Sequence, residues 1–354
     1  MARPERCALP RAVGRRPVAV AAILLVALVF GACAGGTTDA TSTSAPLSIE
    51  LAEPGAELPE GLGLVAEERD GTRTVTSAWG TVAVPSHPKR IVSVEGDIDF
   101  EAMLALGVRP VGAGTPHGRA DEPFAANVAA LANGVKPLAW ADGVPVDEIA
   151  KLRPDLIFVP DEETADLLSD IAPAVPRGSW VGTDWKQNFR YIAAVLGKGE
   201  AAADQLAAWE YRAVRVHASI ADRMEGRTVA SPRLTDDPAD VRVDSPHAFS
   251  SAVLVELGLE LAPVVLISDD DDSRGVPLQE LGGLDADVLF WQVHRDAGGV
   301  VNAGTLPSAR SNPVWASLPA VQAQAVYEVE DRPWALPTIL GANRILDDVE
   351  QALA

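Results

Sequence analysis

Residues 199–224 read GEAAADQLAAWEYRAVRVHASIADRM and form the longest helical signal in the chain. Apolar side chains recur on one face at spacings of three or four residues, at Leu206, Trp209, Ala213, Val216, Ile220 and Met224. At about 1.5 Å per residue, such a helix spans roughly 40 Å. That length is enough to cross from one folded lobe to another. A stiff helix in this role disfavours large hinge motion between the lobes.

A second helical segment precedes the long one. Asp184 and Gln187 have the spacing of a capping box, and Gly197 interrupts the pattern that follows. The apolar positions of this segment are Trp185, Phe189, Ile192 and Leu196. Residues 184–226 are therefore expected to form the helices that connect two lobes.

An internal repeat supports two lobes of related architecture. Residues 144–159 read VPVDEIAKLRPDLIFV and residues 276–291 read VPLQELGGLDADVLFW, which aligns Glu148 with Glu280 without a gap. A second repeat precedes each, with AMLALGVRPV at 102–111 and AVLVELGLELAPV at 252–264. Two repeats in the same order are unlike a chance similarity of helix and strand units.

Short apolar runs alternate with amphipathic segments across both halves, as in α/β folds. The expected strands are Arg90–Val94, Pro110–Gly114, Leu156–Val159, Arg227–Ala230, Val241–Val243, Val264–Ile267, Val288–Trp291 and Ala325–Val329. The predicted fold has two α/β lobes joined by a long helix, with a ligand cleft between the lobes.

The N-terminus has the features of an export signal. Five arginines and one glutamate lie in residues 1–16, and residues 17–30 read PVAVAAILLVALVF. The segment ends in Phe30-Gly31-Ala32-Cys33, which resembles a bacterial lipoprotein signal, so Cys33 is the expected lipidation site. Secretion with Cys33 as a free thiol is the alternative. Arg15-Arg16 leaves both the general and the twin-arginine export routes open.

The charge balance argues against nucleic acid as a partner. The chain has 354 residues, with 50 acidic against 29 basic side chains and a formal net charge of −21. Removal of residues 1–32 takes away five arginines and one glutamate and lowers the net charge to −25. Cys7 and Cys33 are the only cysteines, so no disulfide can join the later segments.

These observations predict five regions along the chain. They are a signal peptide at 1–32, a flexible tether and N-terminal extension at 33–71, an N-terminal lobe at 72–183, connecting helices at 184–226 and a C-terminal lobe at 227–354. The tether begins AGGTTDATSTSAP after Cys33 and has no apolar period. The mature protein is expected at the cell membrane, lipid-anchored on its extracytoplasmic face.

The chain from about Trp79 to its end resembles the helical-backbone (class III) solute-binding proteins of ABC importers for ferric siderophores, haem or cobalamin. Six motifs in order carry this resemblance: WGTVAVPSHPKRIVSV at 79–94, LALGVRPVGAG at 104–114, VDEIAKLRPDLIFV at 146–159, DWKQNFRYIAAVLGKGEAA at 184–202, NPVWASLPAV at 312–321 and LDDVEQAL at 346–353. The resemblance implies a ligand held between the lobes and ABC permease subunits as partners. It implies no cofactor and does not choose the ligand.

Loops after the expected strands supply the candidate ligand-binding residues, because ligands of α/β sheets bind outside the carboxyl ends of strands. These candidates are Thr115, His117, Arg119, Glu162, Trp180, Arg233, His247, His294, Arg295 and Trp334. Arginine and tryptophan together suit a planar or aromatic ligand with negative charge. Equally, a loop arginine can be solvated or paired with an acid. A loop histidine can contact the ligand, complete an iron coordination sphere or serve only as a hydrogen-bonded loop residue.

Three acidic residues are candidates for permease docking. In the resembled family, an acidic residue on the rim of each lobe docks onto arginines of the permease. The repeat places Glu148 and Glu280 at equivalent positions, and Asp147 is an alternative on the first lobe because Gln279 occupies its register. A charged helix start favoured by the helix dipole explains these acids equally well.

Catalysis has no support in the sequence. It contains no GxSxG, HExxH or GxxxxGK[ST] motif, and no metal site is predicted. The expected function is capture of a ferric siderophore and its delivery to an ABC importer for iron uptake. Alternatives are a binding protein for cobalamin or haem, and a tethered extracytoplasmic hydrolase or adhesion module.

Overall fold

A three-stranded antiparallel sheet comes first in the computed structural model, which describes residues 63–119, 121, 124–179, 182–234, 240–265, 273–294 and 305–354. Its strands are β1 (Leu64–Arg69), β2 (Thr72–Ser77) and β3 (Gly80–Pro85). Asp70 and Gly71 both have positive φ between β1 and β2, as a tight hairpin turn requires. β1 begins upstream of the Thr72 boundary. The domain boundaries themselves stay a prediction.

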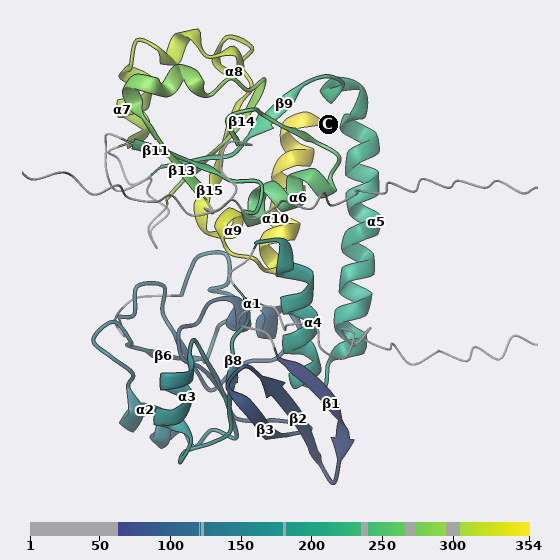
Figure 1. Cartoon of the computed structure of the whole chain (residues 1–354), viewed down its shortest axis with the longest axis vertical. Coiled ribbons are helices and arrows are strands. Elements are labelled where there is room, and N and C mark those ends of the chain that lie inside the picture. Colours follow the sequence, from purple (N-terminus) through teal and green to yellow (C-terminus); the bar gives the residue numbers. More distant parts are fainter. Residues whose placement is uncertain are drawn as a thin grey trace, which may run out of the picture. The chain divides into compact units, whose positions relative to one another are not determined.

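A five-stranded parallel sheet forms the core of the first lobe (Figure 1). Its order is β6-β5-β4-β7-β8, with β4 (Ile91–Ser93), β5 (Gly112–Gly114), β6 (Lys136–Leu138), β7 (Leu156–Val159) and β8 (Ala174–Pro176). The helices between the strands are α1 (Ile98–Ala105), α2 (Val146–Leu152) and α3 (Glu162–Leu168). Every residue of β4 and β7 is buried, as in parallel sheets covered on both faces.

The second lobe is built on a mixed sheet with β14 (Val288–Val293) in the middle. β14 is buried throughout and pairs in parallel with β9 (Thr228–Ala230), β10 (Pro232–Leu234) and β15 (Val326–Glu330). The outer strands are β11 (Asp240–Asp244), β12 (Glu260–Leu261) and β13 (Ser273–Pro277). Its helical segments are α6 (Phe249–Glu256), η3 (Leu278–Gly283), α7 (Thr305–Ser311), η4 (Trp315–Ser317), α8 (Pro319–Gln322), α9 (Asp331–Ala335) and α10 (Ile339–Leu353).

The connecting helices are α4 (Trp185–Val195), after a turn of 3₁₀ helix η1 (Gly182–Asp184), and α5 (Gly199–Met224). α5 has the predicted bounds, and all six predicted apolar positions on its inner face are buried. Gln205 donates to the carbonyl of Ala105 at the end of α1, and α5 packs along α10 of the second lobe. The helix therefore contacts both lobes. The capping box was wrong, because Asp184 makes no side-chain hydrogen bond to the helix.

The repeat seen in the sequence is also a repeat of hydrogen bonds. α1 ends at Leu106-Gly107 and α6 at Leu257-Gly258, and both glycines have φ near +72°. After each helix, three successive backbone N–H groups, from the leucine, the glycine and the following residue, donate to carbonyls of the last turn. Such endings satisfy the free carbonyls of a helix and favour glycine at the left-handed position. A helical segment then precedes a buried strand in both lobes, α2 before β7 and η3 before β14.

One expected strand was wrong and several were missed. Val264 and Val265 lie in a turn after the two-residue strand β12, and residues 266 and 267 lie outside the described residues. The sequence did not predict β1, β2, β3, β6, β8, β10, β12 and β13. No helix among the described residues is long and apolar enough to cross a membrane. The export signal and Cys33 lie outside that part of the chain.

Candidate functional site

A charged cluster lies at the carboxyl edge of the first sheet, where β4 and β8 end. Arg177 follows β8, and its side chain lies 3.0 Å from the Glu95 carboxylate and 3.4 Å from that of Asp97. Asp97 accepts a hydrogen bond from the N–H of Ile98 at the start of α1, at 2.6 Å. The sequence reasoning missed Arg177, because it follows a three-residue strand that was not predicted.

Burial makes it costly to ionise all the acids around Arg177 at the same time. Asp99 is fully buried, and desolvation, with the neighbouring Asp97 charge, raises its pKa well above the ordinary value. Burial and Asp97 likewise raise the pKa of Glu95, against the lowering effect of Arg177. The positive charge of Arg177 is thus shared among several acids.

A buried ion pair joins the two lobes. Glu101 on α1 of the first lobe is completely buried, and Arg332 on α9 of the second lobe approaches it with Nε at 3.6 Å. Asn127 donates to one carboxylate oxygen of Glu101 at 3.1 Å and Thr338 to the other at 2.9 Å. Arg332 also donates to the carbonyl of Gly96 at 3.4 Å. Burial raises the pKa of Glu101, and the Arg332 charge opposes that rise.

The position of Glu101 in the sequence could have predicted that this residue is buried with a partner. It lies in the apolar segment IDFEAMLA, so it had to be buried once that helix packed against the sheet. A buried carboxylate needs a partner, and the partner here comes from 231 positions further along the chain.

Two of the predicted histidines approach each other from different lobes. The rings of His117, which follows β5, and His294, which follows β14, have centroids 6.2 Å apart in an edge-to-face arrangement. His294 Nδ1 lies 2.9 Å from Asp331 Oδ2. The structure therefore brings together predicted site residues from both lobes at this point.

Thr115 and Arg119 shape the loop that carries His117. Thr115 is buried, and its hydroxyl donates to the carbonyl of Arg119 at 2.8 Å. The Arg119 side chain is exposed and pairs with Asp121 at 3.3 Å, which lowers the pKa of Asp121. Arg119 can exchange this partner at little cost, because both groups are solvated.

Arg233 and His247 lie in the second lobe. Arg233 is the middle residue of β10, and its guanidinium lies 3.5 Å from the buried Asp244. Ser250 and Gln292 donate to the same carboxylate at 2.6 and 2.8 Å. His247 is exposed in the turn before α6.

Two predicted ligand residues lie elsewhere. Trp334 is fully buried in α9, where its ring packs on Phe290 with centroids 5.0 Å apart and its N–H donates to Asp348 at 2.8 Å. This residue is part of the core and offers no surface for a ligand. Glu162, at the start of α3, lines a pocket formed by elements of the first lobe alone. Trp180 and Arg295 lie outside the described residues.

The predicted docking acids are on the surface. Asp147 and Glu148 are exposed in the first turn of α2, where Glu148 lies 4.0 Å from Lys136. Glu280 is exposed in the first turn of η3. The two lobes therefore carry the repeated acid at the same place in their repeats. Within the described residues, no group of three or more His, Cys, Asp or Glu side chains is arranged to hold a metal ion.

Comparison with known proteins identifies the family. A family model described as periplasmic binding protein matches residues 91–333. The Bacillus subtilis protein named "Probable siderophore-binding lipoprotein YfiY" is 30% identical over 289 residues, which cover 79% of this chain and 87% of that protein.

Solved structures agree with the fold. The siderophore periplasmic binding protein from the fuscachelin gene cluster of Thermobifida fusca is 25% identical, with a TM-score of 0.63 over 76% of this chain and 98% of that chain. Staphylococcus aureus SirA complexed with staphyloferrin B is 21% identical, with a TM-score of 0.65 over 79% of this chain and 98% of that chain. Since the family model spans well over half of its residues, this chain belongs to the periplasmic binding protein family.

Proposed function

We propose that this protein captures a ferric siderophore outside the cytoplasm and delivers it to an ABC importer for iron uptake. The observation that carries this proposal is the relative named as a probable siderophore-binding lipoprotein, which is similar across most of both chains. Of the two solved structures described above, one is a siderophore periplasmic binding protein and the other is a complex with staphyloferrin B. The mechanism is binding and release, with no chemical step.

The proposed ligand contacts come from the loops of both lobes. Among the described residues they are His117, Arg119, Arg233, His247 and His294, with Arg177 and Arg332 added from the geometry. The predicted contact Thr115 is fully buried and instead supports the loop that carries His117. Trp180 and Arg295 remain proposed contacts from their loop positions. An anionic chelate would compete with carboxylates that already pair with these arginines, most easily with Asp121 for Arg119.

Tryptophan-fluorescence titration tests the ligand. The purified protein is titrated with ferric hydroxamates, ferric catecholates, haem and cobalamin. Saturable quenching by a siderophore supports the proposal. Silence across all siderophores with saturation by haem or cobalamin would transfer the function to that ligand, and turnover of a substrate would favour a tethered hydrolase.

Two arginine substitutions test the contacts. Arg119→Ala combined with Arg295→Ala should weaken an anionic chelate by about tenfold or more, the effect of losing charge-assisted hydrogen bonds. Arg190→Ala combined with Arg215→Ala removes the same charge from exposed positions of α4 and α5 and serves as the control. Equal affinities in the two double variants would reject these contacts.

The membrane anchor and the docking acids complete the proposal. Cys33→Ser should release the protein from membranes into the medium and abolish incorporation of a labelled fatty acid.

Glu148→Gln combined with Glu280→Gln should reduce siderophore uptake in cells while the ligand affinity of the purified protein stays the same. Asp147 is tested in the same way. Uptake at the wild-type rate would show that these acids only begin helices.

A further inference from the structure

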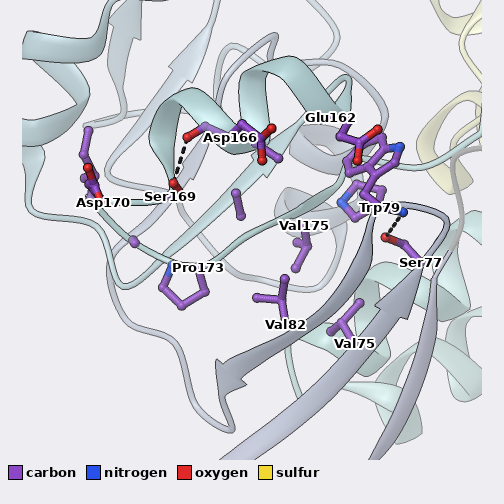
Figure 2. Close-up of a pocket in the computed structure, with 15 residues that line it drawn as sticks. Val75, Ser77, Trp79, Val82, Glu162, Asp166, Ser169, Asp170, Pro173 and Val175 are labelled. Atoms are coloured by element: carbon purple, nitrogen blue, oxygen red, sulfur yellow. Dashed lines mark hydrogen bonds between the residues drawn. The ribbon is translucent and has the colours of Figure 1, made fainter.

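A pocket lies away from the interlobe loops, within the first lobe. It has a volume of about 330 Å³ and lies between β2 and β3 on one side and α3 with β8 on the other. Val75, Val82 and Val175 contribute its apolar wall (Figure 2). The volume is at the lower end of the range for small-molecule sites, which is about 300–1,000 Å³.

The charged side chains that line this pocket are all acidic. They are Glu162 and Asp166 on α3 and Asp170 just after it, and no Lys, Arg or His is among the lining residues. Figure 2 shows Glu162 beside Trp79 at one end of the pocket and Asp170 at the other. Within the described part of the chain, none of the three carboxylates forms an ion pair. All three carboxylates are exposed, so they are accessible to a cation.

Trp79 adds the second feature that selects a cation. Its side chain is half-buried at the turn between β2 and β3 and packs against the hydrophobic core of the lobe. Its backbone N–H donates to the Ser77 hydroxyl at 3.2 Å, which fixes the turn. The face of an indole ring attracts a cation by about 0.5–2 kcal/mol, depending on how far the cation is desolvated.

The charge pattern disfavours two other occupants. Residues 45–62, the segment just before the described chain, contain Glu50, Glu53, Glu57 and Glu60 and no basic residue, so the acidic pocket would repel them. A second copy of a chain with a net charge of −21 is disfavoured for the same reason.

We infer that this pocket binds a small organic cation, in which an ammonium or guanidinium group is carried on an apolar stem. The stem packs along the partly exposed Val82 and Trp79. The cation lies between the indole and the Glu162 and Asp166 carboxylates. This binding is independent of the proposed siderophore site.

Isothermal titration calorimetry with three matched probes tests the inference. We expect 2-phenylethylammonium to bind saturably, 2-phenylethanol to bind several-fold more weakly and phenylacetate not to bind. Raising the salt concentration should weaken only the ammonium. Equal affinity for the alcohol and the ammonium, or no saturable heat from any probe, would overturn the inference.

Single substitutions localise the binding. Glu162→Gln and Asp166→Asn should each weaken the ammonium by about twofold to fivefold, the effect of one partly solvated charge pair. Glu163→Gln removes the same charge from the neighbouring position on α3, which does not line the pocket, and should leave the affinity unchanged. An equal loss of affinity in Glu163→Gln would mean that the ammonium responds only to the overall negative charge of the protein, which would reject the site. Ferric siderophore should not displace the ammonium whether or not the first proposal holds.

Discussion

The single side chains with the largest energetic consequences are the buried acids. Arg332→Met leaves the carboxylate of Glu101 buried without its cationic partner. We expect the free energy of unfolding to fall by about 2–4 kcal/mol, somewhat below the usual range for a broken buried pair because Arg332 is partly exposed. Urea denaturation measures this change.

The control for that substitution is Arg344→Met. Arg344 pairs with Asp348 at 2.9 Å on α10 in a half-exposed setting, so its loss should change stability by about 0.5 kcal/mol or less. Similar losses in the two variants would contradict the interlobe role of Glu101 and Arg332.

Asp99 makes stability depend on pH. Burial raises its pKa in the folded state, so the folded protein holds its proton over a pH range in which the unfolded chain has lost it. The stability that this group contributes is therefore fully present below its unfolded pKa and is lost as the pH rises through the folded pKa. Asp99→Asn should stabilise the protein at pH 7 relative to the wild type and should bring much less gain near pH 4.

Urea denaturation of the wild type and of Asp99→Asn at pH 7 and pH 4 isolates this effect. The other acids contribute equally to the stability of the two proteins. Asp99 faces Asp97, Arg177, Ser93 and Tyr191. The same pair of measurements on Asp97→Asn shows how much of the effect comes from the neighbouring negative charge. A gain for Asp99→Asn that is larger at pH 4 than at pH 7 would contradict the assignment.

The repeated helix ends allow a comparison between elements. Gly107 and Gly258 end α1 and α6 with nearly equal positive φ, so alanine at either position costs about 1–2 kcal/mol of backbone strain. A Cβ on Gly107 meets open space, whereas one on Gly258 would lie 2.7 Å from Nδ1 of His217 on α5. That imidazole nitrogen is 2.9 Å from the Leu257 carbonyl, so the ring must move and lose this contact.

We therefore expect Gly258→Ala to lower the free energy of unfolding by at least about 1 kcal/mol more than Gly107→Ala. Thermal and urea denaturation of the two variants measure the difference. Equal losses would mean that His217 moves aside freely and that its contact with the end of α6 contributes little to stability.

The sequence predicts elements well where the signal is local. The apolar face of α5 and the glycines that end α1 and α6 follow from spacing alone, and they match the structure. β6 and β8 have three residues each and contain a proline, so no alternating pattern marks them. Trp334 follows the last strand in sequence, yet α9 begins at once and turns its ring into the core.

The site is less predictable than the elements, because it depends on contacts between distant segments. Loop position alone nominated His117 and His294, which do approach each other. It could not find the pairing of Glu101 with Arg332, which needs the packing of both lobes. It also assigned Glu162 to the ligand, although this residue lines the separate pocket of the first lobe.

At the scale of the whole molecule, net charge governs how a ligand arrives. Without residues 1–32 the chain carries −25, so an anionic chelate meets a repulsive long-range field before it reaches the arginines. The Debye length falls from about 30 Å at 10 mM salt to about 8 Å at 150 mM. Added salt therefore screens the distant acids more than the close contacts with the ligand.

For an anionic ferric siderophore, we expect the association rate to rise by a few-fold between 10 and 150 mM salt, with a smaller change in the dissociation rate. Stopped-flow fluorescence measures both rates, and an uncharged ferric chelate serves as the control, because its association should not depend on salt. An association rate that falls with salt would mean that the basic loops outweigh the surrounding acids. The field at the site would then be attractive despite the net charge of the chain.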